Sequence, residues 1–131
     1  MQQNCNFGLE KIAQVAIRVE HPARAAAFYK DVLGMKHLYS FGELAFFDCG
    51  GVRLMLSPAE KPEFNHPASI LYYEVDDVEE AYETLRGRGV VFEAEPHIVA
   101  KMPAYDLWMA FFRDSEGNTL ALMEEAEKEA A

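Results

Sequence analysis

Ala45-Phe46-Phe47 returns in the second half of the chain as Ala110-Phe111-Phe112. Each copy is followed by a short polar or Gly-containing turn and then by an alternating apolar strand, at residues 52–56 and 119–123 respectively. Upstream of each copy, a β-strand pattern leads into an amphipathic helix. Elements repeated in the same order indicate a duplicated supersecondary unit whose two copies bury a shared face.

Period-two alternation and helical spacing divide each copy into a strand, a helix and three further strands. The predicted elements are a strand at 11–20, a helix at 22–33 and strands at 36–42, 43–49 and 52–57, then a strand at 68–75, a helix at 78–88 and strands at 90–97, 105–113 and 119–124. Asp77 followed by Glu80 is a capping-box pattern for the second helix. The tail from 124 to 131 is charged and helix-favouring, and we expect it to be loosely held.

These elements predict an α+β fold, in which two tandem β-α-β-β-β modules form curved mixed sheets around a central cleft. Module one covers about residues 10–58 and module two about 68–125, within a single domain of residues 1–131. A Pro-rich linker at 58–67 joins them. Its length leaves open whether the modules pair within one chain or are exchanged between two chains.

Composition narrows the class of protein. The chain has 131 residues, 50% of them hydrophobic, which is enough for an ordinary core. Its formal net charge of −10 argues against nucleic acid as a partner. No apolar run approaches the ~20 residues that cross a bilayer, and residues 1–8 lack a signal-peptide pattern. With two cysteines expected to be free thiols, we expect a cytoplasmic protein without membrane contact.

Four stretches make the chain resemble the vicinal oxygen chelate superfamily, the group of glyoxalases, bleomycin-resistance proteins and extradiol dioxygenases. They lie in both halves: Val15-Ala16-Ile17-Arg18-Val19, Ala27-Phe28-Tyr29-Lys30-Asp31-Val32-Leu33-Gly34, Val75-Asp76-Asp77-Val78 and Phe112-Arg113-Asp114-Ser115-Glu116-Gly117-Asn118. The resemblance implies the same paired modules. It also implies two metal ligands from each module, one on its first strand and one on its last.

The register of the resemblance places those four ligand positions at Gln14, Met55, Ile70 and Ala121. One amide oxygen does not hold a hard divalent ion, and Met, Ile and Ala supply no hard ligand. The four histidines stand at element ends without metal-binding spacing. We therefore expect no metal site and no cofactor.

Strand parity predicts which side chains line the cleft. The face turned away from the helices combines aromatic and thioether surface with a few polar groups, the usual composition of a small-molecule pocket. The predicted ligand-binding residues are Gln14, Phe46, Arg53, Met55, Tyr72, Glu74, Met109 and Phe111. The opposite parity, which includes Val15, Ile17, Leu54, Leu56, Leu71, Leu120 and Leu122, should pack under the helices.

Arg53 is the most informative of these residues, since an inward charge in mid-strand must be paired or reach water. It could bind a carboxylate or phosphate through its planar fork, or form an ion pair with Glu74 or Glu43. Tyr72 and Glu74 could act as a general acid/base pair, or simply share a hydrogen bond.

The leading hypothesis is a metal-independent protein that binds a small anionic or aromatic molecule, as the antibiotic-binding branch of the superfamily does. The alternatives are a glyoxalase- or dioxygenase-type metal enzyme, and a metal-free enzyme using Tyr72, Glu74 and Arg53. Exposed sheet edges also predict a symmetric homodimer beside the cleft. The apolar candidates for its contact are Phe64, Leu107 and Trp108.

Overall fold

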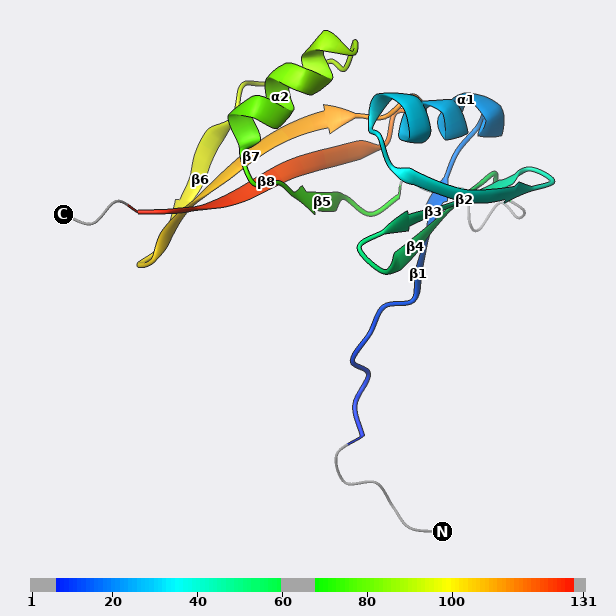
Figure 1. Cartoon of the computed structure of the whole chain (residues 1–131), viewed down its shortest axis with the longest axis horizontal. Helices are drawn as coiled ribbons and strands as arrows, with labels where there is room; N and C mark the ends of the chain where they lie inside the picture. The colour runs from blue at the N-terminus through cyan, green and yellow to red at the C-terminus, as the bar shows by residue number, and fades with distance from the viewer. Residues whose placement is uncertain (1–6, 60–67, 129–131) are drawn as a thin grey trace.

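The computed structural model describes residues 7–59 and 68–128, and it contains the two predicted modules (Figure 1). Module one consists of β1 (Gln14–Arg18), α1 (Pro22–Ala27), the π-helical turn η1 (Phe28–Val32), β2 (Lys36–Phe41), β3 (Leu44–Cys49) and β4 (Val52–Ser57). Module two consists of β5 (Leu71–Glu74), α2 (Val78–Gly87), β6 (His97–Lys101), β7 (Tyr105–Arg113) and β8 (Thr119–Glu127). The α+β prediction is confirmed. Most of the predicted linker, at 60–67, lies outside the described residues.

Each module forms one four-stranded mixed sheet, and the two sheets have the same topology. Their strand orders are β1-β4-β3-β2 and β5-β8-β7-β6. The first strand of each module pairs in parallel with the last, while the other neighbours are antiparallel. The repeated Ala-Phe-Phe run lies on β3 in one sheet and on β7 in the other. The duplication read from the sequence is therefore a duplication of structure.

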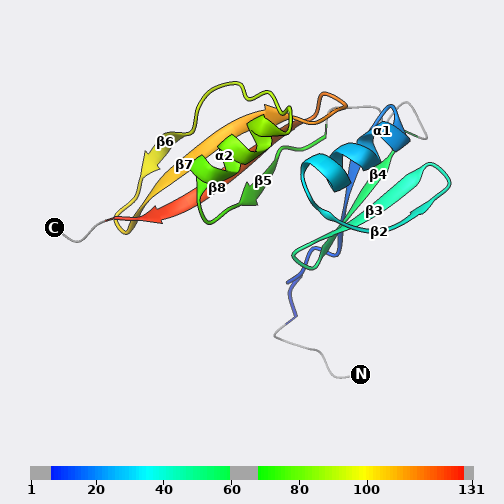
Figure 2. The same ribbon diagram turned by 45° about the horizontal axis from the view of Figure 1, so that its top comes forward.

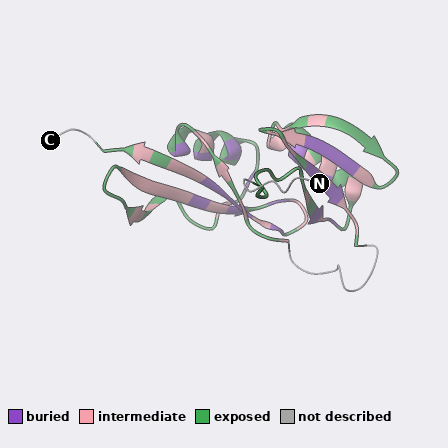
Figure 3. Ribbon diagram, turned by 90° about the horizontal axis from the view of Figure 1, so that it is seen from below, coloured by how far each residue is buried: buried purple, intermediate pink, exposed green. Residues whose placement is uncertain are grey.

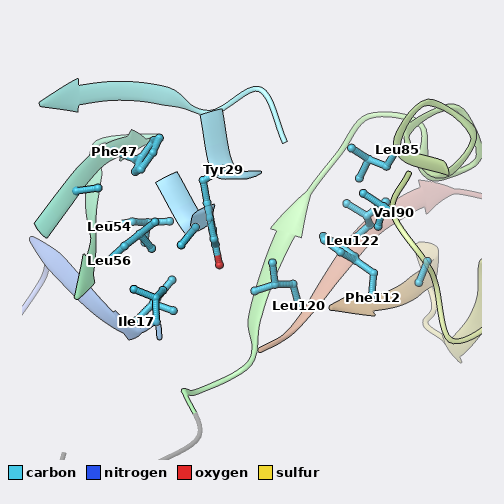
Figure 4. Packing of buried hydrophobic residues seen from close by; sticks show 14 of the residues in the cluster. Ile17, Tyr29, Phe47, Leu54, Leu56, Leu85, Val90, Phe112, Leu120 and Leu122 are labelled. Atoms are coloured by element: carbon cyan, nitrogen blue, oxygen red, sulfur yellow. The ribbon is translucent and has the colours of Figure 1, made fainter. Parts of the chain in front are cut away.

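Both helices lie on the same side of the molecule, each over its own sheet (Figures 1 and 2). They cover the strand faces of the predicted parity, so the core contains Ile17, Leu54, Leu56, Leu120 and Leu122, with Val15 and Leu71 packed against it. The buried cluster runs through both modules, and Figure 4 shows Tyr29 between the aliphatic groups of the two sheets. One continuous core therefore holds the two modules together.

The turn between β7 and β8 connects module two to module one. We call its residues Asp114, Glu116 and Asn118 the inter-module latch. The Asp114 Oδ2 accepts a 2.7 Å hydrogen bond from the Tyr29 hydroxyl, and the Asn118 Nδ2 donates to the Arg18 carbonyl at 3.0 Å. Gly117, at φ +83°, allows the tight backbone that brings these side chains to one side of the turn.

Glu116 makes the densest set of latch contacts. Its Oε1 accepts hydrogen bonds from the backbone N–H groups of Glu20 (2.9 Å) and His21 (2.7 Å), at the start of α1. Its Oε2 lies 2.8 Å from the Arg24 Nε, and its side chain has 0% exposure. Burial acts to raise the pKa of Glu116, but these bonds and one from Ser115 outweigh it and lower the pKa from 4.5 to about 2.

Several predicted element bounds agree with the structure. The strands at 52–57 and 105–113 are found with those limits, and Asp77 caps α2 by accepting the Glu80 N–H at 3.1 Å. The strands predicted at 11–20 and 68–75 are shorter, because only Gln14–Arg18 and Leu71–Glu74 pair with a neighbouring strand. The first helix changes to π-helical form at Phe28 and ends before Gly34, which has φ +71°.

Two predictions were wrong. The strand expected at 90–97 starts only at His97, because Val90 instead buries its side chain beneath α2 and Phe92 makes a single bridge to Phe112. The tail expected at 124–131 to favour a helix and to be loosely held instead continues β8 as far as Glu127, because β7 is long enough to pair with it up to Tyr105; residues 129–131 lie outside the described residues. Within the described residues, none of the helices has the length and apolar character needed to cross a membrane.

Candidate functional site

The sheet faces turned away from the helices carry the predicted ligand-binding residues. Figure 3 views the molecule from below and shows half-buried and exposed residues along both sheets. Arg53, Tyr72 and Glu74 are exposed, Met55, Met109 and Phe111 are half-buried, and Phe46 is 8% exposed. We call this surface the open face. The structure brings its residues together in two groups, one on each sheet.

The module-one group is a connected cluster around Arg53. Strand pairing sets Gln14 opposite Arg53, and the Arg53 Nε donates to the Gln14 Oε1 at 2.7 Å. The guanidinium carbon lies 5.5 Å from the centre of the Phe46 ring, a cation–π arrangement. The Gln14 Nε2 is 3.8 Å from the Met55 sulfur. All four residues predicted from module one are therefore neighbours.

Tyr39 belongs to the same cluster although the sequence reasoning missed it. Its ring stacks on Phe46 with centroids 4.7 Å apart. A β-bulge between His37 and Tyr39 puts His37 against the core residue Phe47 and Tyr39 against the open face. Simple alternation gives these two residues the same face, so no parity count could have found Tyr39.

The module-two group contains Tyr72, Glu74, Met109 and Phe111. Tyr72 and Phe111 meet edge to face at 6.0 Å, on either side of Ala121. Glu74 and Met109 both pair with Met123, a half-buried residue that the prediction omitted. Within residues 7–59 and 68–128, no hydrogen bond or ion pair joins this group to the Arg53 cluster.

The described contacts test two of the interactions considered from the sequence: an ion pair of Arg53 and a hydrogen bond between Tyr72 and Glu74. Among the residues that the structure describes, no carboxylate lies within 4.0 Å of Arg53, so the ion pair considered with Glu74 or Glu43 is not formed there. Within the same residues, no hydrogen bond joins Tyr72 to Glu74. The Arg53 guanidinium is oriented by an amide and an aromatic ring, and Arg53 is an exposed residue.

The four expected metal positions do not fit a metal ion. Gln14 already accepts from Arg53, and Met55 offers only a thioether. Ile70 is 43% exposed and Ala121 is fully buried, and neither has a donor atom in its side chain. Across the described ranges, no three His, Cys, Asp or Glu residues are grouped as metal ligands would be. His66 lies outside those ranges.

Paired β-α-β-β-β modules with the same strand order define a known class of fold, and comparison with known proteins assigns the family. The sequence profile of the Glyoxalase/Bleomycin resistance protein/Dioxygenase superfamily matches residues 11–122, so the chain belongs to this superfamily. A curated relative, the uncharacterized protein YraH of Bacillus subtilis, is 29% identical over 126 residues, covering 86% of this chain and 96% of the relative.

Solved structures show the same fold. A superfamily member from Sphaerobacter thermophilus superposes with a TM-score of 0.75 at 24% identity, covering 89% of this chain and 98% of that one. TnmS3, an antibiotic binding protein from Streptomyces sp. CB03234, gives 0.74 at 20% identity, with 92% and 100% covered. Lactoylglutathione lyase from Agrobacterium tumefaciens gives 0.69 at 24% identity, with 88% and 94% covered.

Proposed function

We propose that this chain is a metal-independent small-molecule binding protein whose ligand lies on the open face. The arrangement of Arg53 is the observation that carries the proposal. A guanidinium that is fixed by Gln14 and Phe46 and has no carboxylate within 4.0 Å in the described residues is prepared for an outside partner. Holding such a cation in an otherwise acidic chain favours a carboxylate or phosphate on the ligand.

The apolar part of the ligand would lie on the aromatic and thioether groups around Arg53. Tyr39 and Phe46 form a stacked pair, and Tyr72 with Phe111 presents a second aromatic surface on the other sheet. Such surfaces suit an aromatic ligand. The same fold in an antibiotic binding protein supports a binding role, and the donor-poor metal positions count against the lyase and dioxygenase alternatives.

We propose further that a second copy of the chain covers the open face in a homodimer. Tyr72 is 47% exposed and Tyr39 48% exposed, on a face rich in apolar groups. A two-fold contact would bury this surface and enclose the ligand. Of the contact residues expected from the sequence, Leu107 and Trp108 are half-buried on β7, and Phe64 lies outside the described residues. Light scattering at micromolar concentration should give a dimer mass, and a monomer mass would contradict this part of the proposal.

Substitution of Arg53 tests the binding site. A charge-assisted contact to Arg53 contributes about 1.5–3 kcal/mol to binding. Arg53→Ala should therefore lower the affinity for an aromatic carboxylate or phosphate by roughly 10- to 100-fold. Arg86→Ala is the matched control, because Arg86 stands 5.2 Å from the Tyr82 ring centre in the same kind of cation–π contact, but on α2. Calorimetric titration with a panel of aromatic carboxylates and phosphates measures the affinities of both variants. Equal affinities in the parent and in Arg53→Ala would refute the site.

A metal-free enzyme remains the second candidate, because Tyr72, Glu74 and Arg53 share the open face. It predicts turnover that Tyr72→Phe and Glu74→Gln abolish while ligand binding survives. A metal-dependent enzyme predicts instead one tightly held transition metal per chain after dialysis, which elemental analysis detects. We expect less than stoichiometric metal.

A further inference from the structure

A cavity of about 570 Å³ lies between the two modules on the helix-covered side, away from the open face. Module one contributes Leu33, Met35 and Cys49 to its wall, and module two contributes Tyr73, Leu85 and Phe112 among others. In Figure 4, Leu85, Phe112 and Leu122 of module two lie on one side of Tyr29, and Phe47 of module one lies on the other. Its volume is within the range of pockets that hold small organic molecules. We call it the inter-module pocket.

Tyr73 supplies a polar group without a partner in this mainly apolar wall. Its hydroxyl oxygen is buried, and no atom of the described residues hydrogen-bonds to it. A buried hydroxyl without a partner costs free energy, so such a group is normally satisfied by something that occupies the space beside it. Burial raises the pKa of Tyr73 above its ordinary value, with smaller contributions from Cys49 and Asp114, so the hydroxyl stays protonated and able to donate.

Cys49 brings a second weakly polar group to the pocket from the opposite module. Strand β3 ends at Cys49, and its half-buried thiol is free. Burial, followed by the nearby Asp48, raises the pKa of this thiol. A thiol kept protonated is a soft, weakly polar surface rather than a charged one. The pocket interior is therefore neutral.

The rim of the pocket disfavours anions. Asp76, Asp77 and Glu80 line it at the start of α2. Arg88 is the one cation that the described residues bring to the wall, and it already donates to the Val32 carbonyl at 2.9 Å and so bridges the modules. The excess of carboxylates opposes entry of a negative ligand. The charge preference is thus opposite to the one expected at Arg53.

We infer that the inter-module pocket is a second ligand site, for a neutral, mainly apolar small molecule that presents an acceptor oxygen to the Tyr73 hydroxyl. This site is separate from the open face and does not depend on the function proposed there. A ligand in it touches both modules, and its affinity depends on the two modules keeping their present arrangement.

Prodan, a neutral naphthyl ketone with solvent-sensitive fluorescence, is a suitable probe, because its rings fit apolar walls and its carbonyl accepts a hydrogen bond. Cys49 provides a local readout. In a Cys5→Ser chain, the rate at which Cys49 reacts with a small thiol reagent at mildly alkaline pH reports access to the pocket. Bound prodan should fluoresce at shorter wavelength and slow this reaction.

Two substitutions at the wall test the assignment. Tyr73→Phe removes only the hydroxyl. It should lower the affinity for prodan about fivefold, which corresponds to one neutral hydrogen bond of about 1 kcal/mol. Thr84→Trp fills the pocket from an exposed position on α2 and should abolish protection of Cys49. Glu79→Trp is its control, since Glu79 is exposed on the same helix and is not part of the wall. Thermal unfolding checks that each variant folds.

The outcomes separate this site from the open face. The proposal is supported if prodan protects Cys49 in the parent and in Glu79→Trp, protects it less in Tyr73→Phe, and does not protect it in Thr84→Trp. Arg53→Ala should leave the protection of Cys49 unchanged. If prodan at its solubility limit does not protect Cys49, the proposal of a second ligand site is overturned, and water is the occupant of the pocket. Equal protection by the anionic dye anilinonaphthalene sulfonate would overturn the selection for neutral ligands. Unchanged affinity in a folded Tyr73→Phe chain would overturn the role of the hydroxyl.

Discussion

Helices α1 and α2 occupy the same place in the repeat but begin in different ways. The start of α2 is stabilised within its own module: Asp77 accepts the Glu80 N–H, and Glu124 accepts the Val78 N–H at 2.9 Å. The start of α1 has no side-chain cap from His21, and Glu116 of the other module instead accepts the backbone N–H groups of Glu20 and His21, just before the helix. Module two is therefore locally complete at this point, whereas module one depends on module two.

This difference shows that two copies of a duplicated unit can be stabilised by different contacts. Both copies keep the same sheet topology, and alternation along the strands sets which face of each sheet is buried. The helix starts have diverged, because a cap can come from any group that reaches the free N–H donors. The following four predictions test how strongly module one depends on the inter-module latch, in order of decreasing effect.

Asp114→Ala should have the largest effect. Asp114 is 6% exposed, and its two oxygens accept from Tyr29, the Asn118 side chain and the backbone N–H groups of Glu116 and Asn118. Removing the carboxylate leaves several buried donors without partners, at a cost of about 3 kcal/mol. Urea unfolding at fixed protein concentration measures it. Asp31→Ala, at an exposed position of η1, should stay within about 0.5 kcal/mol of the parent.

Glu116→Gln should cost about 2 kcal/mol, because charge-assisted hydrogen bonds to Arg24 and to the two backbone N–H groups become neutral ones or are lost. Glu83→Gln is the matched control. Glu83 also faces an arginine, Arg86 at 3.4 Å, but its side chain is 65% exposed, and such pairs contribute about 0–1 kcal/mol. Equal losses in the two variants would mean that the latch contributes no more than a surface ion pair.

Acid should weaken the same contact. The pKa of Glu116 is about 2 in the folded chain against an ordinary 4.5, so its stabilisation is fully present above pH 4.5. It is lost progressively as the pH falls from 4.5 toward 2, because the unfolded chain then binds the proton first. Urea midpoints across this range should fall less steeply in Glu116→Gln than in the parent. Parallel slopes would contradict the assigned pKa.

Asp77→Ala should have the smallest effect, about 1 kcal/mol, the usual value of one N-cap side chain. Glu124 remains to accept the Val78 N–H, which limits the loss. Hydrogen exchange should show faster opening in the first turn of α2 and little change in α1. A loss larger than that of Glu116→Gln would reverse the comparison between the two helix starts.

The sequence predicted what depends on neighbouring residues and missed what depends on distant ones. Alternation alone located the strands at 52–57 and 105–113 and assigned their faces, because a buried side selects one register. The cap of α2 was visible since Asp77 and Glu80 are three residues apart. The contact of Glu116 with the backbone just before α1 was not visible, because Glu116 lies 95 residues from His21 along the chain.

The candidate site shows the same difference between features that neighbouring residues specify and features that depend on distant contacts. The residues expected on the open face share strand parity and do lie on its two sheets, but Tyr39 was lost to a bulge that changes the parity. The strand expected at 90–97 failed because Val90 was needed in the core beneath α2. The sequence predicted a central cleft but not the inter-module pocket on the helix-covered side, whose wall exists only where two separately predicted modules meet and contains none of the predicted ligand-binding residues.

The latch also has a consequence for the order in which the chain becomes stable during synthesis. The latch residues are made 85 to 100 positions after the module-one groups that they contact around α1. Module one therefore leaves the ribosome with its first helix unfinished, and such long-range contacts form late because closing a long loop costs entropy. A nascent chain that stops before Asp114 should be degraded faster by protease than the finished protein, even though all of module one is already present.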